Sequence, residues 1–366
     1  MHRFVKTMFS MIFIILLPFS VLADNLPPNW PWKGVNIDNI DFTKDKLIDV
    51  ITELNINSVQ LRLNPRKLSK RLKVSNKNAW IKSLDWASDM LDVCKDNNIS
   101  VILTVEGFPV DSEKGYNHTS PKFWFDENNL QEVVNLASEL SLRFKNRGSE
   151  LVAYQLLSEP VIKVGPTTID PPQLPALIDK VIVALRKNDP NRWIAISPSP
   201  WGLPHGYKKF KYLAHKNIIY GAHMYMPHRY THQGIRQYKD DVISYPGTVS
   251  GKEWNKEQLI KAMADLRKFQ VKYSVPVWIG EFSAIRWAPG AEQYLIDLID
   301  IFDQYNWSWT YFSLNGWHGW NPNYSNKRSS ERNWKSDYIG RKSQRWSTLR
   351  NVLNTETKQN IKNETL

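Results

Sequence analysis

Cysteine is almost absent from this 366-residue chain, which contains Cys94 alone. A single cysteine cannot form a disulfide within the chain, so packing must hold the core together. Low-complexity tracts are also missing and 42% of the residues are hydrophobic, which excludes an intrinsically disordered protein. After the N-terminus there is no apolar run long enough to cross a bilayer. These absences leave a globular chain whose length fits two average domains or one α/β barrel.

Negative charge is in deficit, and the net charge is +12. The lysines and arginines are scattered, apart from a basic stretch at 67–77 and a second cluster at 327–345. We find no nucleic-acid-binding motif, so we expect a solvated basic surface and no nucleic-acid partner. Attraction to an anionic cell envelope or polysaccharide remains an open alternative.

The N-terminus has the composition of a targeting signal. Basic residues precede a short apolar run at 8–22, and small residues end it at Ala23. This pattern predicts a secretory signal peptide at 1–23 and a secreted or periplasmic protein, with an uncleaved anchor as the minor alternative. We expect the catalytic domain to span 24–354, followed by a polar tail at 355–366.

Eight apolar segments of strand-like composition alternate with segments of helical periodicity. The expected strands are Lys33–Ile37, Ser58–Leu63, 100–106, 151–160, 192–199, 217–225, 275–282 and 307–315. The expected helices are 43–54, 80–97, 126–145, 174–185, 255–271, 291–304 and 344–353, and a basic loop is expected after residue 63. No linker interrupts the alternation, which favours a single (β/α)8 TIM barrel over two doubly wound domains.

Two of the expected strands end in a carboxylate. The segment LVAYQLLSEP ends in Glu159 followed by Pro160, and VPVWIGEF carries Glu281 near its end. Proline cannot donate a ladder hydrogen bond, so the first strand should stop there and leave Glu159 at its carboxyl end. In a barrel such strand ends carry catalytic groups. Either glutamate alone is as readily explained as a surface residue, but the two together predict a pair of facing carboxylates, as glycoside hydrolysis requires.

Other residues suggest a sugar site or a competing metal site. The chain has 16 tryptophans, and those that do not fill the core could stack on sugar rings. Three histidines at 223, 228 and 232 raise the alternative of a zinc site, but their spacing suits no common zinc pattern. We therefore expect no metal and no cofactor.

Taken in order, these motifs resemble glycoside hydrolase family 5, the endoglucanase-like and mannanase-like enzymes of the retaining (β/α)8 clan. YQLLSEP is similar to the acid/base motif on strand four, and WIGEF is similar to the nucleophile motif on strand seven. HMYMPHRYTHQG, VQLRL and the tryptophan-rich last strand match further segments of the family. The resemblance covers nearly the whole mature chain and implies a monomeric enzyme with a carbohydrate substrate.

The resemblance also implies roles for individual residues. Glu159 would be the acid/base and Glu281 the nucleophile. Arg62 and Tyr225 would donate hydrogen bonds near the nucleophile, and His223 would contact sugar hydroxyls or orient the carboxylates. Arg62 could equally be half of a structural ion pair. The sugar-platform candidates, of which the first is preferred, are Trp317, Trp309 and Trp320.

Two positions depart from the family pattern. Ser158 stands where the family has an asparagine that would bind the sugar's 2-hydroxyl, and Glu106 lies in a loop where many relatives have a histidine. Glu106 could form part of the site or be an unrelated loop carboxylate, and we expect a minor role for it. Serine is shorter and offers one donor where an amide offers two.

We expect a secreted retaining hydrolase of β-linked glucan or mannan, with a non-catalytic glycan-binding barrel as the alternative. A third hypothesis is an envelope protein whose basic surface binds anionic polymer.

Overall fold

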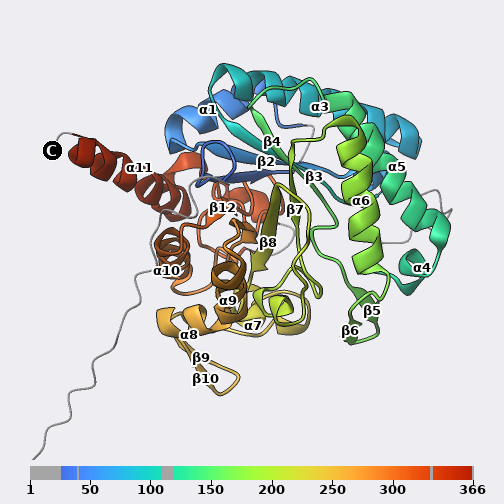
Figure 1. The fold of residues 1–366 in the computed structure, drawn as a ribbon. Helices are drawn as coiled ribbons and strands as arrows, with labels where there is room; N and C mark the ends of the chain where they lie inside the picture. The colour runs from blue at the N-terminus through green and yellow to red at the C-terminus, as the bar shows by residue number, and fades with distance from the viewer. Residues whose placement is uncertain (1–25, 39–40, 109–118, 330–332, 365–366) are drawn as a thin grey trace, which may run out of the picture.

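The computed structural model describes residues 26–38, 41–108, 119–329 and 333–364. Its centre is a closed barrel of eight strands in the order β1, β2, β3, β4, β7, β8, β11 and β12, with β12 pairing back to β1 (Figure 1). Every pairing in the barrel is parallel. The predicted (β/α)8 barrel is thereby confirmed.

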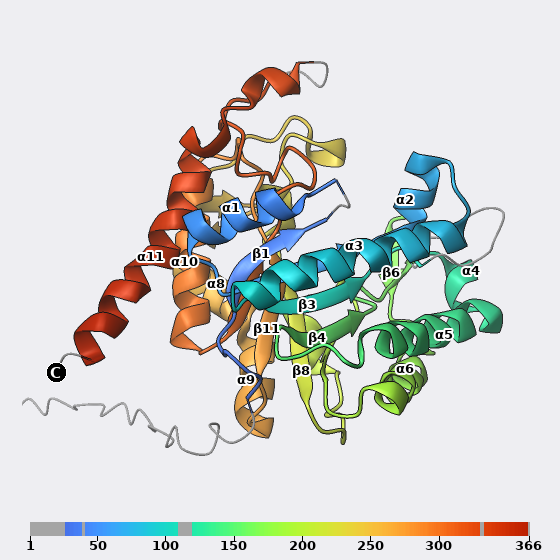
Figure 2. The same cartoon turned by 90° about the horizontal axis from the view of Figure 1, so that it is seen from above.

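The barrel strands are β1 (Lys33–Ile37), β2 (Ser58–Leu63), β3 (Ser100–Val105), β4 (Leu151–Leu156), β7 (Trp193–Ile196), β8 (Ile218–Met224), β11 (Val277–Phe282) and β12 (Ser308–Tyr311). The helices are α1 (Lys44–Leu54), α2 (Pro65–Leu72), α3 (Asn76–Asp96), α4 (Pro121–Trp124), α5 (Glu127–Phe144), α6 (Leu174–Asn188), α7 (His228–Thr231), α8 (Lys256–Ala262), α9 (Ala264–Tyr273), α10 (Ala291–Gln304) and α11 (Gln344–Glu364). The long helices surround the strands, as the view from above shows (Figure 2). Two small hairpins, β5 (Ile162–Val164) with β6 (Thr167–Ile169) and β9 (Gly247–Val249) with β10 (Lys252–Trp254), lie outside the barrel.

Each expected strand exists, but two helical predictions were wrong. The basic segment after β2 is α2 and not a loop: Asn64 caps it by accepting from the backbone N–H of Lys67, and Pro65 occupies its first turn. The expected helix at 255–271 is two helices, α8 and α9, separated at Met263. Both errors concern the outer layer and leave the barrel unchanged.

The barrel interior is filled in two layers. An aromatic and aliphatic cluster occupies the end where the strands begin, and includes Trp32, Ile102, Val152, Trp193 and Trp278. Above it lies a layer of buried polar side chains that bond to one another, formed by Gln60, Thr104, Gln155, Ser197 and Thr310. This order places apolar packing at one end and hydrogen-bonding groups toward the carboxyl ends of the strands.

A β-bulge decides which way Glu281 points. Ile279 pairs with Ala222, but the next paired residue is Glu281, opposite His223. Trp278 packs inside the barrel and Phe282 packs outside against Phe302, so unbroken alternation would have turned Glu281 outward. The extra residue is a glycine, and bulges of this kind re-aim side chains near active sites.

The expected signal peptide, residues 1–23, lies outside the described residues. Among the residues that the structure describes, none of the helices combines the length and hydrophobicity needed to cross a membrane. Helix α11 continues to Glu364, into the segment expected as a polar tail.

Candidate active site

The predicted site residues come from separate strands and meet at the carboxyl end of the barrel. Arg62 lies on β2, Glu159 follows β4, and His223 and Glu281 lie on β8 and β11. Tyr225 follows β8 directly. Because all barrel strands are parallel, their carboxyl ends open at one face, and these side chains converge there.

Glu281 is held by two donors. The Tyr225 hydroxyl donates to its Oε2 at 2.9 Å, and Nη2 of Arg62 lies 3.1 Å from its Oε1. The Glu281 side chain is only 6% exposed, so these contacts fix it in a site with little water. This is the environment of a carboxylate whose orientation matters.

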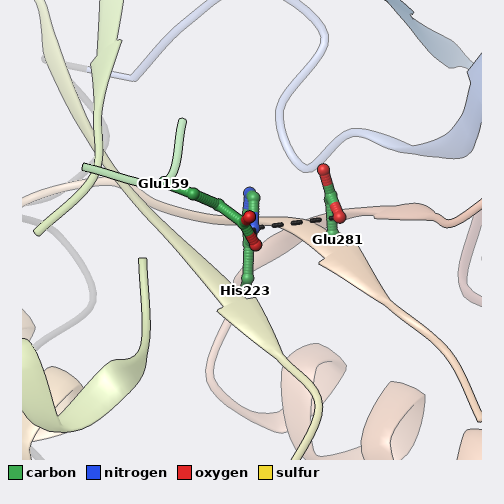
Figure 3. A group of neighbouring side chains, drawn as sticks. All are labelled: Glu159, His223 and Glu281. Carbon is green, nitrogen blue, oxygen red and sulfur yellow. Dashed lines mark hydrogen bonds and ion pairs between the residues drawn. The ribbon is translucent and has the colours of Figure 1, made fainter. Parts of the chain in front are cut away.

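His223 lies between the two carboxylates. Its Nδ1 is 2.9 Å from Oε1 of Glu159 and 3.8 Å from Oε2 of Glu281 (Figure 3). Oxygen atoms of the two glutamates lie within 4.8 Å of each other. The side chain of Glu159 is 30% exposed, so it faces the solvent side while Glu281 lies deeper.

The end of β4 turns sharply to present Ser158 and Glu159. Leu157 has φ 61°, a left-handed conformation that costs a leucine of order 1–3 kcal/mol and is found mostly at functional sites. Gly202, in the loop after β7, closes against the same turn, because a Cβ there would lie 2.9 Å from the Ser158 carbonyl oxygen. The strained turn is therefore held by its neighbours.

The two departures from the family pattern contact each other. The Ser158 hydroxyl donates to Oε1 of Glu106 at 2.8 Å. Oε2 of Glu106 pairs with Nη2 of Arg62, the same nitrogen that contacts Glu281. Of the two readings of Glu106, these contacts favour a member of the site over an unrelated loop carboxylate.

The charges in this site act on one another strongly. Burial opposes the charge of Arg62, but Asp38, Glu106 and Glu281 outweigh it and raise the pKa of Arg62. Burial would raise the pKa of Glu106, but Arg62 and the hydroxyl of Ser158 lower it below its usual range. Arg62 and Glu106 therefore form a charged pair.

Burial has the opposite outcome at the nucleophile candidate. It raises the pKa of Glu281 to about 7, against the lowering by Arg62 and His223. Burial also disfavours the charged form of His223, but Glu281 and Glu159 raise its pKa overall. The site thus holds a proton near neutral pH.

An aromatic wall borders the carboxylates. Phe312, just after β12, packs its ring 4.5 Å from the Arg62 guanidinium carbon, and Trp320 and Trp317 follow outward at centroid separations of 5.7 and 5.1 Å. Trp317, the preferred platform, is 38% exposed but two rings from Arg62. Trp309 is 1% exposed and packs on Phe282, so that candidate platform is wrong. Phe312 was missed because nothing in the sequence marks one phenylalanine of a buried-looking strand as facing the site.

The three histidines do not converge. His228 and His232 stack on each other with centroids 3.8 Å apart, while His223 faces the glutamates. Among the described residues, Glu159, His223 and Glu281 are the group of possible ligands whose atoms approach within 4.8 Å. Their hydrogen bonds with one another and with Tyr225 account for that approach, and we assign no metal to it.

Comparison with known proteins agrees with this geometry. The family model "Cellulase (glycosyl hydrolase family 5)" matches residues 24–317. Endoglucanase C of Acetivibrio thermocellus is 24% identical over 258 residues, which cover 63% of this chain and 68% of that protein. Endoglucanase 3 of Fibrobacter succinogenes is 25% identical over 236 residues, covering 56% of this chain and 35% of its own length.

Solved structures share the fold. Cel5A of Thermotoga maritima in complex with cellobiose superposes with a TM-score of 0.63 at 17% identity, covering 87% of this chain and 97% of that one. Subunit Z of the clostridial cellulose synthase from Clostridioides difficile gives a TM-score of 0.64 at 19% identity, covering 87% of this chain and 99% of that one. The family model covers well over half of the chain, so this protein belongs to the cellulase family, glycosyl hydrolase family 5, and is a glycoside hydrolase.

Proposed function

We propose that this protein is a secreted retaining hydrolase of β-linked glucan or mannan-type polysaccharide, with Glu159 as acid/base and Glu281 as nucleophile. The observation that carries the proposal is the carboxylate separation, with oxygen atoms within 4.8 Å. Retaining enzymes have carboxyl groups about 5–5.5 Å apart, whereas inverting enzymes need roughly 6.5–9.5 Å to admit a water.

The proposed reaction has two displacements. In the first, an oxygen of Glu281 forms a bond to the anomeric carbon while the bond to the leaving oxygen breaks and takes the proton of Glu159. In the second, Glu159 removes a proton from water, which attacks the anomeric carbon and frees Glu281. Arg62 and Tyr225 orient Glu281 for the attack, and His223 keeps Glu159 in place.

Substrate class and location are inferred from the relatives and from the N-terminal sequence. Relatives are named endoglucanases, and Thermotoga maritima Cel5A has been solved with both cellobiose and mannotriose. We therefore favour β-glucan, with mannan as the nearest alternative. We also propose that a signal peptide at 1–23 is removed, that 24–354 form the catalytic domain, and that the mature enzyme is a monomer; the mass of the exported chain tests the first point.

The test compares the mature chain with Glu159→Gln and Glu281→Gln on β-glucan, mannan and xylan. The matched control is Glu150→Gln, a buried glutamate immediately before β4, at the opposite end of the barrel. We expect hydrolysis by the wild type and the control, loss of at least about a thousandfold in both site variants, and a first product of retained configuration by NMR. An inverted first product would refute the double displacement.

The alternative is a glycan-binding barrel without activity. Its specific support is Ser158, whose hydroxyl donates to Glu106, so that its only hydrogen is not available to a sugar hydroxyl. A 2-deoxy-2-fluoro glycoside with a good leaving group should label Glu281, detected by mass spectrometry of the peptide. Binding of polymer with no labelling and no hydrolysis would favour the alternative.

A further inference from the structure

A third carboxylate lies in the catalytic centre, and double displacement has no use for it. Glu106 follows β3, and its side chain is 15% exposed. Both of its oxygens are engaged, one by the hydroxyl of Ser158 at 2.8 Å and the other by the guanidinium of Arg62. Its position is therefore fixed before any substrate binds.

Arg62 forms ion pairs with three carboxylates. Nη1 lies 3.0 Å from Oδ1 of Asp38, whereas Nη2 serves both Glu106 and Oε1 of Glu281. The ring of Phe312 covers the guanidinium, and the Arg62 side chain is 8% exposed. Nη2 carries two hydrogens and contacts both carboxylates, so Glu106 and Glu281 share one donor group and one positive charge.

The charge around Glu281 is unbalanced. Arg62 from β2, His223 from β8 and the Tyr225 hydroxyl face it as donors, while Glu106 after β3 and Glu159 after β4 face it as acids. On the β12 side, the ring of Phe312 packs against the Arg62 guanidinium. With Asp38 included, four carboxyl groups surround one arginine and one histidine, so acids outnumber cations in the centre even when His223 is protonated.

We propose that Glu106 is a positioning residue that shares Arg62 with the nucleophile and so limits how far Arg62 stabilises the negative charge of Glu281. The inference rests on the nucleophile assigned above. When Glu281 bonds to the anomeric carbon its charge disappears, the repulsion from Glu106 ends, and Nη2 of Arg62 is left to Glu106. Glu106 thereby favours the loss of negative charge from Glu281 in the first displacement.

The proposal predicts a change in pH dependence that a purely structural role would not produce. In Glu106→Gln a negative charge disappears and Arg62 turns to Glu281, so both effects make Glu281 lose its proton at lower pH. We expect the acid limb of kcat/KM to move down by about one pH unit, which is about tenfold in the ionisation equilibrium. Glu106→Asp, which keeps the charge, should restore the wild-type limb.

Asp38→Asn is the matched control. It also removes a carboxylate from Arg62, but from Nη1, which does not contact Glu281. We expect its acid limb to stay at the wild-type pH, whatever its rate. Glu106→His is the second variant if Glu106→Gln does not fold, and it should move the limb in the same direction because it also removes the negative charge.

A titration without substrate separates this inference from the proposed function. Carbon-13 NMR of labelled glutamate carboxyls, with Glu281→Gln to assign the signal, reports the midpoint of Glu281 in each folded variant. A midpoint about one unit lower in Glu106→Gln and unmoved in Asp38→Asn supports the proposal even if no sugar is hydrolysed. An unmoved midpoint in Glu106→Gln, or equal displacement in Asp38→Asn, overturns it.

Discussion

Tyr225 offers the simplest test of how Glu281 is held, because it makes one hydrogen bond to it, at 2.9 Å. Tyr225→Phe removes that donor and leaves the ring. A hydrogen bond to a charged group is worth about 1.5–3 kcal/mol, so we expect kcat/KM to fall about 10–100-fold. Loss of a donor to the carboxylate should also move the acid limb toward higher pH.

A second buried tyrosine serves as the control for Tyr225→Phe. The hydroxyl of Tyr294 donates at 2.9 Å to the backbone carbonyl of Met226 and not to a carboxylate. Tyr294→Phe should cost about 0.5–1.5 kcal/mol of unfolding free energy and leave the pH profile in place. An equal shift of the acid limb of kcat/KM in the two variants would contradict the role given to Tyr225.

A site residue could be predicted from the sequence when its immediate neighbours form a recognisable pattern. Glu159 and Glu281 interrupt apolar strands, so each could be recognised from its immediate neighbours. The engagement of Glu106 by Ser158 joins residues 52 apart in sequence, and no local pattern encodes it. The bulge after Ile279 was likewise invisible, because a one-residue shift in pairing leaves the composition of the strand unchanged.

At the scale of elements, the segment after β12 depends on one buried ion pair. Nη2 of Arg286 lies 2.8 Å from Oδ2 of Asp337, and both side chains are at most 1% exposed. Arg286 also donates to the carbonyl oxygens of His318, Ser325 and Lys327, so it ties down the segment that carries the outer aromatic wall.

Arg286→Ala should therefore destabilise the fold and loosen that wall. Removing one partner leaves Asp337 buried without its cation, and such losses cost about 3–5 kcal/mol. Denaturant unfolding measures this loss, and KM for polymer should rise as the wall loosens. Arg143→Ala, which breaks a pair with side chains 46% and 59% exposed, should cost less than about 1 kcal/mol.

Some secondary-structure elements could be predicted from the sequence more easily than others. The barrel strands are apolar on both faces because helices cover the outside and side chains fill the inside, so they read as continuous hydrophobic runs. Helix α2 was missed because its exposed face is basic and only Pro65 and Leu68 are buried. Its cap at Asn64 was the available signal.

At the scale of the whole molecule, the catalytic centre should make stability depend on pH. The folded pKa of Glu281, about 7, exceeds the usual value of 4.5, so between these pH values the folded chain binds more protons there than the unfolded chain. Its contribution to stability is therefore lost as pH rises through this window. His228 and His232 act oppositely, since burial lowers the pKa of both, that of His232 to about 3.

The comparison of wild type with Glu281→Gln isolates the nucleophile from these histidines. The glutamine has no charge to bury, so the stability of the variant relative to wild type should increase from pH 5 to pH 8. One pKa unit corresponds to about 1.4 kcal/mol, which bounds the increase at about 3 kcal/mol. Denaturant unfolding at a series of pH values measures it, and Glu150→Gln should show no such trend. If the difference in unfolding free energy between Glu281→Gln and wild type stays constant with pH, Glu281 is already ionised in the folded chain at pH 5. Burial would then not raise the pKa of Glu281, contrary to the prediction.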